Sequence, residues 1–325
     1  PAYAALVGPW KCPQIDVLLV YHPPITLGVP AIVISRTKRA PFILEIQDLW
    51  PETLLATKML SGGVITGCLS RLADATYRKA TAITVISDGF RRNLISKGVP
   101  AEKLHVIHNW AYEGTFEPVP RDAAIGSEAG LDGKFNILYA GNMGPAQGLS
   151  NVLGAAALLS DLPDVQLVLM GSGIDKAALV AEAATRGLTN VSFIERQPMD
   201  RMPQYYAWAD AVMIHLTDDP LFAITVPGKT QSCLASGRPV LACVAGDAAD
   251  LIESAQAGLA VPPCDPISLA GAIRRLRQME RCDRLRMGQA GRRFYDERLA
   301  PDIAIARYES LFYSVLPNHR NHNTN

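Results

Sequence analysis

A glycine-rich turn between a predicted strand and a predicted helix is the first feature of this sequence that could do chemistry. The stretch YAGNMGPAQGL (139–149) places Gly141, Gly144 and Gly148 between an apolar run and a run with helical spacing. Glycine lets the backbone approach a ligand closely, and the amide groups at a helix amino terminus attract phosphate. The pattern predicts a diphosphate-binding loop, with an ordinary glycine-rich crossover turn as the alternative.

Two further segments support an anion site. The run QLVLMGSG (166–173) ends a predicted strand with Gly171 and Gly173, and ligands of open α/β sheets bind outside the carboxyl ends of the strands. The segment TVPGKTQ (225–231) places Lys229 in the first turn of a predicted helix. A cation there is unfavourable against the helix dipole, which suggests that an anion is shared between Lys229 and the loop amides. A solvated lysine is the alternative.

Two carboxylates follow the predicted strand at 42–46. Asp48 could bind or deprotonate an acceptor hydroxyl or position a sugar, and the alternative is that it caps the following segment. Glu52 comes after Pro51 and is the weaker catalytic candidate, because acidic residues favour the first turn of a helix. For His108, in a strand-to-loop segment, a structural role is expected.

Predicted strands and helices alternate along the whole chain, which is typical of β-α units and a parallel sheet. The first half has predicted strands at 17–21, 42–46, 82–86 and 104–108. The second half has predicted strands at 135–140, 166–170, 191–194, 211–216, 239–244 and 258–261. The stretch at 112–134 contains Pro and Gly without periodicity and reads as a linker. We therefore expect two Rossmann-like halves, the first with fewer strands.

Composition narrows the class of protein. The 325 residues are 49% hydrophobic, which argues against disorder, and 31 basic side chains balance 31 acidic ones, so nothing argues for nucleic acid. The six cysteines show no C-x-x-C spacing, so we expect neither a metal site nor a disulfide framework. No apolar run approaches the roughly 20 residues that span a bilayer, and the sequence reads as cytosolic.

Six segments together resemble a known family. They are DLWPETL (48–54), VIHN (106–109), YAGNMGPAQGL (139–149), LVLMGSG (167–173), TVPGKTQSCLASGRPVL (225–241) and ARYESLFYSVL (306–316). In order and spacing, over nearly the whole chain, they resemble glycosyltransferase family 4. The branch that builds bacterial O-antigen, capsule and colanic-acid-type polysaccharides, including the N-acetylfucosaminyl transferases, is the most similar.

This resemblance implies a GT-B fold of class α/β, with two Rossmann-like domains that face each other across a cleft. It implies an acceptor-side domain over 1–115, a linker over 116–134, a nucleotide-sugar domain over 135–297, and a C-terminal helix over 298–325 that returns toward the first domain and ends in a tail. It further implies that strand-helix units precede Pro1, so that the first domain is incomplete in this chain.

The resemblance also implies an activity. The expected enzyme is cytoplasmic, needs no metal or other cofactor, and moves a hexosyl or N-acetylhexosaminyl group with retention of configuration. Its donor would be a nucleoside-diphosphate sugar, with UDP favoured, and its acceptor a growing saccharide linked to polyprenyl diphosphate. Residues 1–115 carry twelve basic and eight acidic side chains, and this net charge of +4 suits peripheral contact with an anionic membrane face.

The second half departs from the family at two places. Many relatives carry Arg and Lys in the glycine loop, where this chain has Asn142 and Gln147, which would leave more of the diphosphate charge to Lys229. A Glu-x7-Glu motif of many relatives, whose second Glu contacts the ribose, is also absent. Ser232 occupies that second position, and either it or Gln231 could hydrogen-bond the ribose hydroxyls instead.

The first half departs at one place. Many relatives carry a His-Asp pair where this chain has Gln47 and Asp48, so Asp48 is the better catalytic candidate of the two.

Two other functions stay open. A non-hydrolysing nucleotide-sugar epimerase would use the same two-domain fold without an acceptor, and an inactive chain would bind a nucleotide sugar or assist another transferase. Analysis of products with and without acceptor distinguishes the three. A NAD-dependent dehydrogenase fits poorly, because no acidic residue ends the strand at 166–170 to hold an adenosine ribose.

Overall fold

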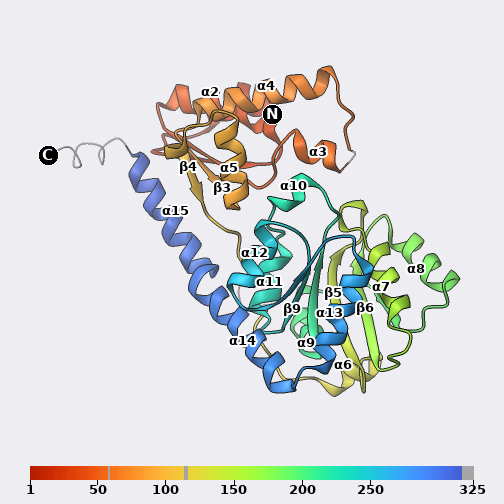
Figure 1. Cartoon of the computed structure of the whole chain (residues 1–325). Helices are drawn as coiled ribbons and strands as arrows, with labels where there is room; N and C mark the ends of the chain where they lie inside the picture. Colours follow the sequence, from red (N-terminus) through yellow and green to blue (C-terminus); the bar gives the residue numbers. More distant parts are fainter. Residues whose placement is uncertain (58, 113–115, 317–325) are drawn as a thin grey trace. The chain divides into compact units, whose positions relative to one another are not determined.

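The computed structural model describes residues 1–57, 59–112 and 116–316. The chain folds into two compact units, the first made of 1–108 with 302–325 and the second of 109–301. The expected end of the first domain, at residue 115, lies outside the described residues, as does the part beyond 316 of the helix and tail expected over 298–325. Figure 1 labels many of the helices and strands and colours the chain in sequence order.

The first unit is a parallel sheet with helices. Its strands, in the spatial order β1-β2-β3-β4, are β1 (Leu18–His22), β2 (Phe42–Ile46), β3 (Ala82–Val85) and β4 (Leu104–Val106). Its helices are α1 (Ala2–Lys11), α2 (Gly28–Lys38), α3 (Glu52–Ala56), α4 (Val64–Lys79), α5 (Asp88–Ser96) and α15 (Pro301–Val315), with short 3-10 turns at Ile25–Leu27 and Ala101–Lys103.

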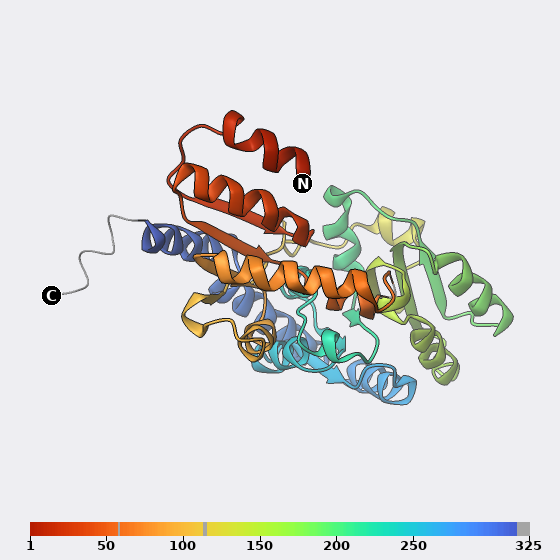
Figure 2. The ribbon, with the colours of Figure 1, turned by 90° about the horizontal axis from the view of Figure 1, so that it is seen from above.

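Helices cover the middle of this sheet because its central strands, β2 and β3, are largely apolar on both faces. Strand β3 is buried at all four positions, as expected for a parallel strand between two helical layers. Helix α1 packs on α2, and α2 packs on α4 (red to orange in Figure 2). Near the end of the chain, Ala304 and Leu311 of α15 are buried in one cluster with Ile43 and Ala82. The C-terminal helix is therefore part of the core of the first unit.

The second unit is a six-stranded parallel sheet in the order β10-β9-β8-β5-β6-β7. Its strands are β5 (Phe135–Asn142), β6 (Val165–Ser172), β7 (Val191–Ile194), β8 (Ala211–His215), β9 (Val240–Cys243) and β10 (Gly258–Val261). Its helices are α6 (Ala123–Glu128), α7 (Ser150–Leu158), α8 (Lys176–Thr185), α9 (Met202–Trp208), α10 (Pro220–Ala223), α11 (Lys229–Ala235), α12 (Asp247–Ser254), α13 (Pro266–Gln278) and α14 (Arg281–Arg298), with short 3-10 turns at Pro145–Gln147 and Met199–Arg201.

Alternating strand residues feed two separate cores on the two faces of this sheet. On one face, Ile137 and Tyr139 of β5 are buried with residues of α7, α8 and α13. On the other face, Leu138 is buried with residues of α6, α9, α11, α12 and α14. The sheet is thus doubly wound, and its order reverses between β5 and β8, where a ligand site is expected.

The segment expected to be a linker differs from the prediction. Within 116–134, residues 123–128 form α6, and Phe116, Ile125 and Leu131 are buried in the core of the second unit. The Nε1 of Trp208 donates to the carbonyl of Asp122 at 2.8 Å, which ties this segment to α9. The sequence of this segment did not predict these contacts, because each is made with a residue far away in the chain and leaves no local periodicity.

Among the described residues, no helix is both long enough and apolar enough to cross a membrane.

Candidate functional site

Two glycines face each other where β5 and β6 end. The strands pair in parallel register, with Gly141 opposite Gly171. A Cβ at position 171 would lie 1.9 Å from the Gly141 carbonyl oxygen, and the Gly171 backbone has a φ of 144° that L side chains rarely adopt. Only glycine fits there, so these two strand ends approach each other through bare backbone.

A cavity of about 400 Å³ opens at these strand ends, and all of its lining residues belong to the second unit. Five of the residues predicted from sequence line it: Gly141, Asn142, Gly171, Lys229 and Ser232. They come from the carboxyl ends of β5 and β6 and from α11, beside the point where the strand order reverses. The volume lies in the range of small-molecule sites.

Lys229 is the single lysine of this lining and is held in place by a tyrosine. Its Nζ donates to the Tyr139 hydroxyl at 2.6 Å and lies 3.8 Å from the centre of that ring. The Tyr139 hydroxyl in turn donates to the Asn142 carbonyl oxygen at 2.5 Å. A Cβ at Gly141 would lie 2.8 Å from the Nζ, so that glycine leaves room for the ammonium group.

Burial lowers the pKa of Lys229 to about 8, and Cys233 opposes this shift. No aspartate or glutamate is among the described residues that line the cavity. An ammonium group without a carboxylate partner in a shielded cavity is favourable for binding an anion.

The loop after β5 is tied down by Gln147 and His215. The Oε1 of Gln147 accepts from the Gly144 amide at 3.1 Å and from the Asn142 Nδ2 at 3.0 Å. The Gln147 carbonyl oxygen accepts from the Nδ1 of His215, at the end of β8, at 2.6 Å. Burial lowers the pKa of His215 to about 4, so the ring is neutral near pH 7, and this hydrogen bond to a carbonyl requires the tautomer with its proton on Nδ1. These bonds fix the loop before any ligand arrives.

The remaining predicted residues of this half lie around the cavity rather than in its lining. Gly144, Gln147 and Gly148 belong to the tied-down loop, and Gly173 follows β6. Gln231 is buried, and with its amide nitrogen facing the turn it donates to the carbonyls of Pro227 and Gly228 at 3.1 and 2.9 Å. The structure therefore gives Gln231 a role in holding the turn before α11, and Ser232 is the one of the pair that reaches the cavity.

Sequence reasoning missed several lining residues, including Arg196, Gln197 and Tyr206. Arg196 and Gln197 follow β7, the third strand whose carboxyl end lies at this edge. The rule that pointed to the glycines after β5 and β6 could have found them. Tyr206 lies in the short helix α9, and no spacing in the sequence relates it to the glycine loop.

The first unit holds the two predicted carboxylates. Asp48 follows β2 and is half-buried, and this burial raises the pKa of its carboxyl group. The capping alternative for Asp48 is wrong, because α3 has Pro51 at its N-cap position and no side-chain cap. Glu52 begins α3, and its Oε1 accepts from the Lys97 Nζ at 2.5 Å. Asp48 is thus the more available carboxylate.

His22, which sequence reasoning did not select, lies at the end of β1, the strand next to β2. It is almost fully buried, and neither ring nitrogen has a hydrogen-bond partner among the described residues. Its ring meets the edge of Trp50 with 6.1 Å between the ring centres. Burial lowers the pKa of His22 to about 4, so it is neutral near pH 7. The structural expectation for His108 agrees with its Nδ1, which donates to the Ile86 carbonyl at 2.8 Å.

Comparison with known families and proteins gives consistent matches. A family model described as "Glycosyl transferase 4-like domain" matches residues 1–110, and one described as "Glycosyl transferases group 1" matches residues 134–279. The sequence is 32% identical over 213 residues to WcaI of Escherichia coli K12, which is named for colanic acid biosynthesis. It is 27% identical over 236 residues to WbjE of Pseudomonas aeruginosa, named as a glycosyltransferase.

These alignments cover 63% and 71% of this chain, and the chain spans 51% of WcaI and 58% of WbjE. Among solved structures, HepE of Anabaena in complex with UDP-glucose superposes with a TM-score of 0.78, covering 97% of this chain and 84% of HepE at 19% identity. At that identity the likeness shows the fold, which is GT-B, as expected from the sequence.

Proposed function

Because the chain belongs to the group 1 glycosyltransferases of family 4, we propose that it transfers a sugar from a nucleoside-diphosphate sugar to a saccharide acceptor. The observation that carries this proposal is the buried Lys229 ammonium, without a carboxylate partner, beside the glycine-lined ends of β5 and β6. Bond cleavage to the donor sugar leaves negative charge on the departing diphosphate. Lys229 and the nearby backbone amides would stabilise that charge as it develops.

The finer assignments are part of the same proposal. UDP is favoured as the carrier because HepE, which has the same fold, was solved with UDP-glucose. Similarity to WcaI favours a bacterial surface polysaccharide pathway and hence a polyprenyl-linked acceptor. Retention of configuration and the transfer of a hexosyl or N-acetylhexosaminyl group follow from the family resemblance alone. Ser232, which lines the cavity, would hydrogen-bond the donor in place of the missing glutamate.

Lys229→Ala tests the donor site. It should weaken UDP binding by about 1 to 3 kcal/mol, because a charge-assisted hydrogen bond to phosphate is lost, and should leave uridine binding nearly unchanged. Isothermal titration calorimetry measures both affinities. Lys134→Ala is the matched control, since the Lys134 Nζ donates to the Pro163 carbonyl and does not line the cavity. Equal losses for UDP and uridine would show that Lys229 does not act on the diphosphate.

Asp48→Asn tests the acceptor side. A half-buried carboxyl group with a raised pKa suits a group that takes a proton from an attacking hydroxyl. The variant should lower kcat by roughly 100-fold or more while UDP affinity stays the same. The assay measures sugar transfer from a panel of UDP-sugars to a lipid-linked saccharide, with product analysis in the presence and absence of acceptor. Full activity of Asp48→Asn, or an acceptor-independent product, would contradict this assignment.

A further inference from the structure

A second cavity of the second unit lies at the opposite end of the sheet strands. It measures about 460 Å³ and shares no lining residue with the cavity at β5 and β6. Asp210, directly before β8, and Arg238 and Pro239, directly before β9, contribute to its wall, together with the segment 119–121 and the start of α14. The site therefore opens at the amino ends of β8 and β9, and its volume suits a small molecule.

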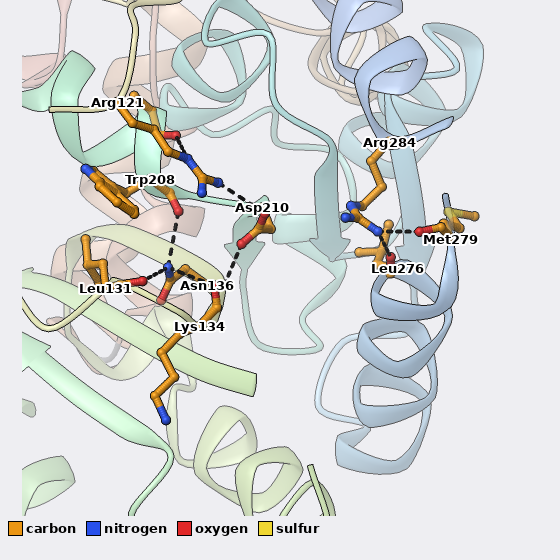
Figure 3. Close-up of polar contacts among 10 residues, drawn as sticks. Arg121, Leu131, Lys134, Asn136, Trp208, Asp210, Leu276, Met279 and Arg284 are labelled. Atoms are coloured by element: carbon orange, nitrogen blue, oxygen red, sulfur yellow. Dashed lines mark hydrogen bonds and ion pairs between the residues drawn. The ribbon is translucent and has the colours of Figure 1, made fainter. Parts of the chain in front are cut away.

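The lining of this cavity is strongly basic. Four arginines take part: Arg121, Arg238, Arg281 and Arg284. Asp210 is the one acidic residue of the described lining, and both of its oxygens already accept hydrogen bonds. Oδ1 accepts from the Nη2 of Arg121 at 3.2 Å, and Oδ2 accepts from the Asn136 amide at 2.9 Å (Figure 3). Positive charge thus exceeds negative charge by three in the cavity wall.

Two of these arginines are held by the backbone. The Arg121 Nε donates to the Ala207 carbonyl at 3.0 Å, and its guanidinium lies 4.9 Å from the centre of the Trp208 ring. The Nη1 of Arg284 donates to the carbonyls of Leu276 and Met279 near the end of α13 (Figure 3). Their positions are fixed, while each guanidinium keeps further donors because it carries five N–H groups.

The guanidinium groups of the other two arginines are not fixed by hydrogen bonds within the described residues. Among the described residues, no hydrogen bond or ion pair involves the guanidinium of Arg238 or Arg281. Arg238 is half-buried, and burial, followed by the positive charge of Arg121, lowers its pKa, while Asp210 opposes this. Positive charges close together in a partly buried cavity wall repel each other, and a bound anion between them relieves this repulsion. A phosphate group matches the planar fork of arginine and accepts several of its hydrogen bonds at once.

We propose that this arginine cavity binds the phosphate monoester group of a small molecule or of a lipid headgroup. The ligand class follows from three unbalanced guanidinium charges, two fixed and two unpartnered side chains, and a volume larger than a bare phosphate needs. The site is separate from the proposed donor cavity and does not depend on that proposal.

The test measures binding of glycerol 3-phosphate by calorimetry and of vesicles by sedimentation. Vesicles of phosphatidylcholine with and without phosphatidic acid present the same monoester on a membrane. The double variant Arg238→Gln with Arg281→Gln changes the two side chains whose guanidinium groups make no hydrogen bond or ion pair within the described part of the chain, so folding should be retained and is checked by thermal melting. If the double variant does not fold, the single variant Arg281→Gln is used instead, because Arg281 is exposed. Arg286→Gln is the matched control, because Arg286 lies on α14 outside the cavity and pairs with Asp283.

Excess UDP is present throughout to occupy the first cavity. Because the double variant changes only residues of the arginine cavity, a difference in monoester affinity between the variants reports on that cavity whether or not UDP binds. The wild type and Arg286→Gln should bind the monoester, and the double variant should bind roughly tenfold or more weakly. Binding of glycerol 3-phosphate assigns a soluble ligand, and binding only to phosphatidic acid vesicles assigns a headgroup. No binding in either form, or the same affinity in all three proteins, or an equal loss in Arg286→Gln would overturn the proposal.

Discussion

Among single residues, Lys229 is the side chain whose surroundings most clearly favour a bound anion. Its ammonium group is taken out of water, and it donates a hydrogen bond to a neutral tyrosine hydroxyl rather than to a carboxylate. Burial disfavours the charged form, which is why its pKa falls from 10.5 to about 8. A bound diphosphate would reverse that shift, because a nearby negative charge favours the protonated lysine.

The pH dependence of UDP binding should follow from this lysine. Above a pH of about 8 the free protein loses the Lys229 proton, while the complex keeps it, so binding must take up a proton. Affinity for UDP should therefore fall by only about twofold between pH 7 and 8 and by up to about tenfold for each unit above that. A terminal phosphate with a pKa near 6 is about nine-tenths ionised at pH 7, so its own titration adds little to this slope. Calorimetry at several pH values measures this slope, and Lys229→Ala should remove it. A slope that persists in Lys229→Ala would assign the titration to another group.

At the scale of elements, the paired ends of β5 and β6 decide whether the cavity forms. Gly171→Ala should cost about 2 to 4 kcal/mol of unfolding free energy, because its Cβ would meet the Gly141 carbonyl oxygen at 1.9 Å and its φ of 144° disfavours a side chain. Gly144→Val is the contrast. Position 144 has extended backbone, and its Cβ would meet the ends of the Asn142 and Gln147 side chains at 3.0 and 3.4 Å.

Urea unfolding and UDP titration of both variants check this contrast. Gly144→Val should keep the stability of the wild type within about 1 kcal/mol and lose UDP affinity, because the valine displaces the contacts that hold the loop. If Gly144→Val unfolds as readily as Gly171→Ala, the main role of the loop is to stabilise the fold, and its role in ligand binding is not supported.

Hydrophobic periodicity and turn-forming residues were enough to predict the strands of both units. They did not predict all of the residues that line the cavity. The strands predicted at 42–46, 191–194 and 258–261 have the same bounds in the structure, and the others differ by at most two residues at an end. Apolar strands between glycines leave a strong local signal. The Tyr139 hydroxyl on Lys229 joins residues 90 positions apart, and its strand pattern marks Tyr139 only as core. The arginine cavity likewise gathers residues from 119 to 285, whose separate sequence contexts look like ordinary surface.

At the scale of the whole molecule, the units do not follow the simple order of the chain. The first unit combines residues 1–108 with 302–325, so its core includes a helix from the far end of the sequence. The second unit begins at 109, well before its first strand at Phe135. The residues between supply Ala111, Phe116 and Ile125 to one face of the core. A nucleotide domain cut at the start of β5 would lack this layer.

A fragment of residues 109–301 should therefore melt cooperatively and bind UDP as the whole chain does, whereas a fragment of residues 135–301 should not. Burial of Phe116, Ile125 and Leu131 contributes roughly 1.5 to 3 kcal/mol for each side chain. Together these are comparable with the about 5 to 15 kcal/mol that stabilises a typical domain.

The shorter fragment also loses two hydrogen bonds that hold α9 and β5. The Trp208 Nε1 would lose the Asp122 carbonyl at 2.8 Å, and the Asn136 Nδ2 would lose the Leu131 carbonyl at 2.9 Å. Phe116 lines the cavity as well, so UDP affinity should fall with stability. Thermal melting with and without UDP compares the two fragments. If residues 135–301 melt at the same temperature as 109–301 and bind UDP equally well, residues 109–134 are not part of the folding unit, and the linker predicted at 112–134 is the better description.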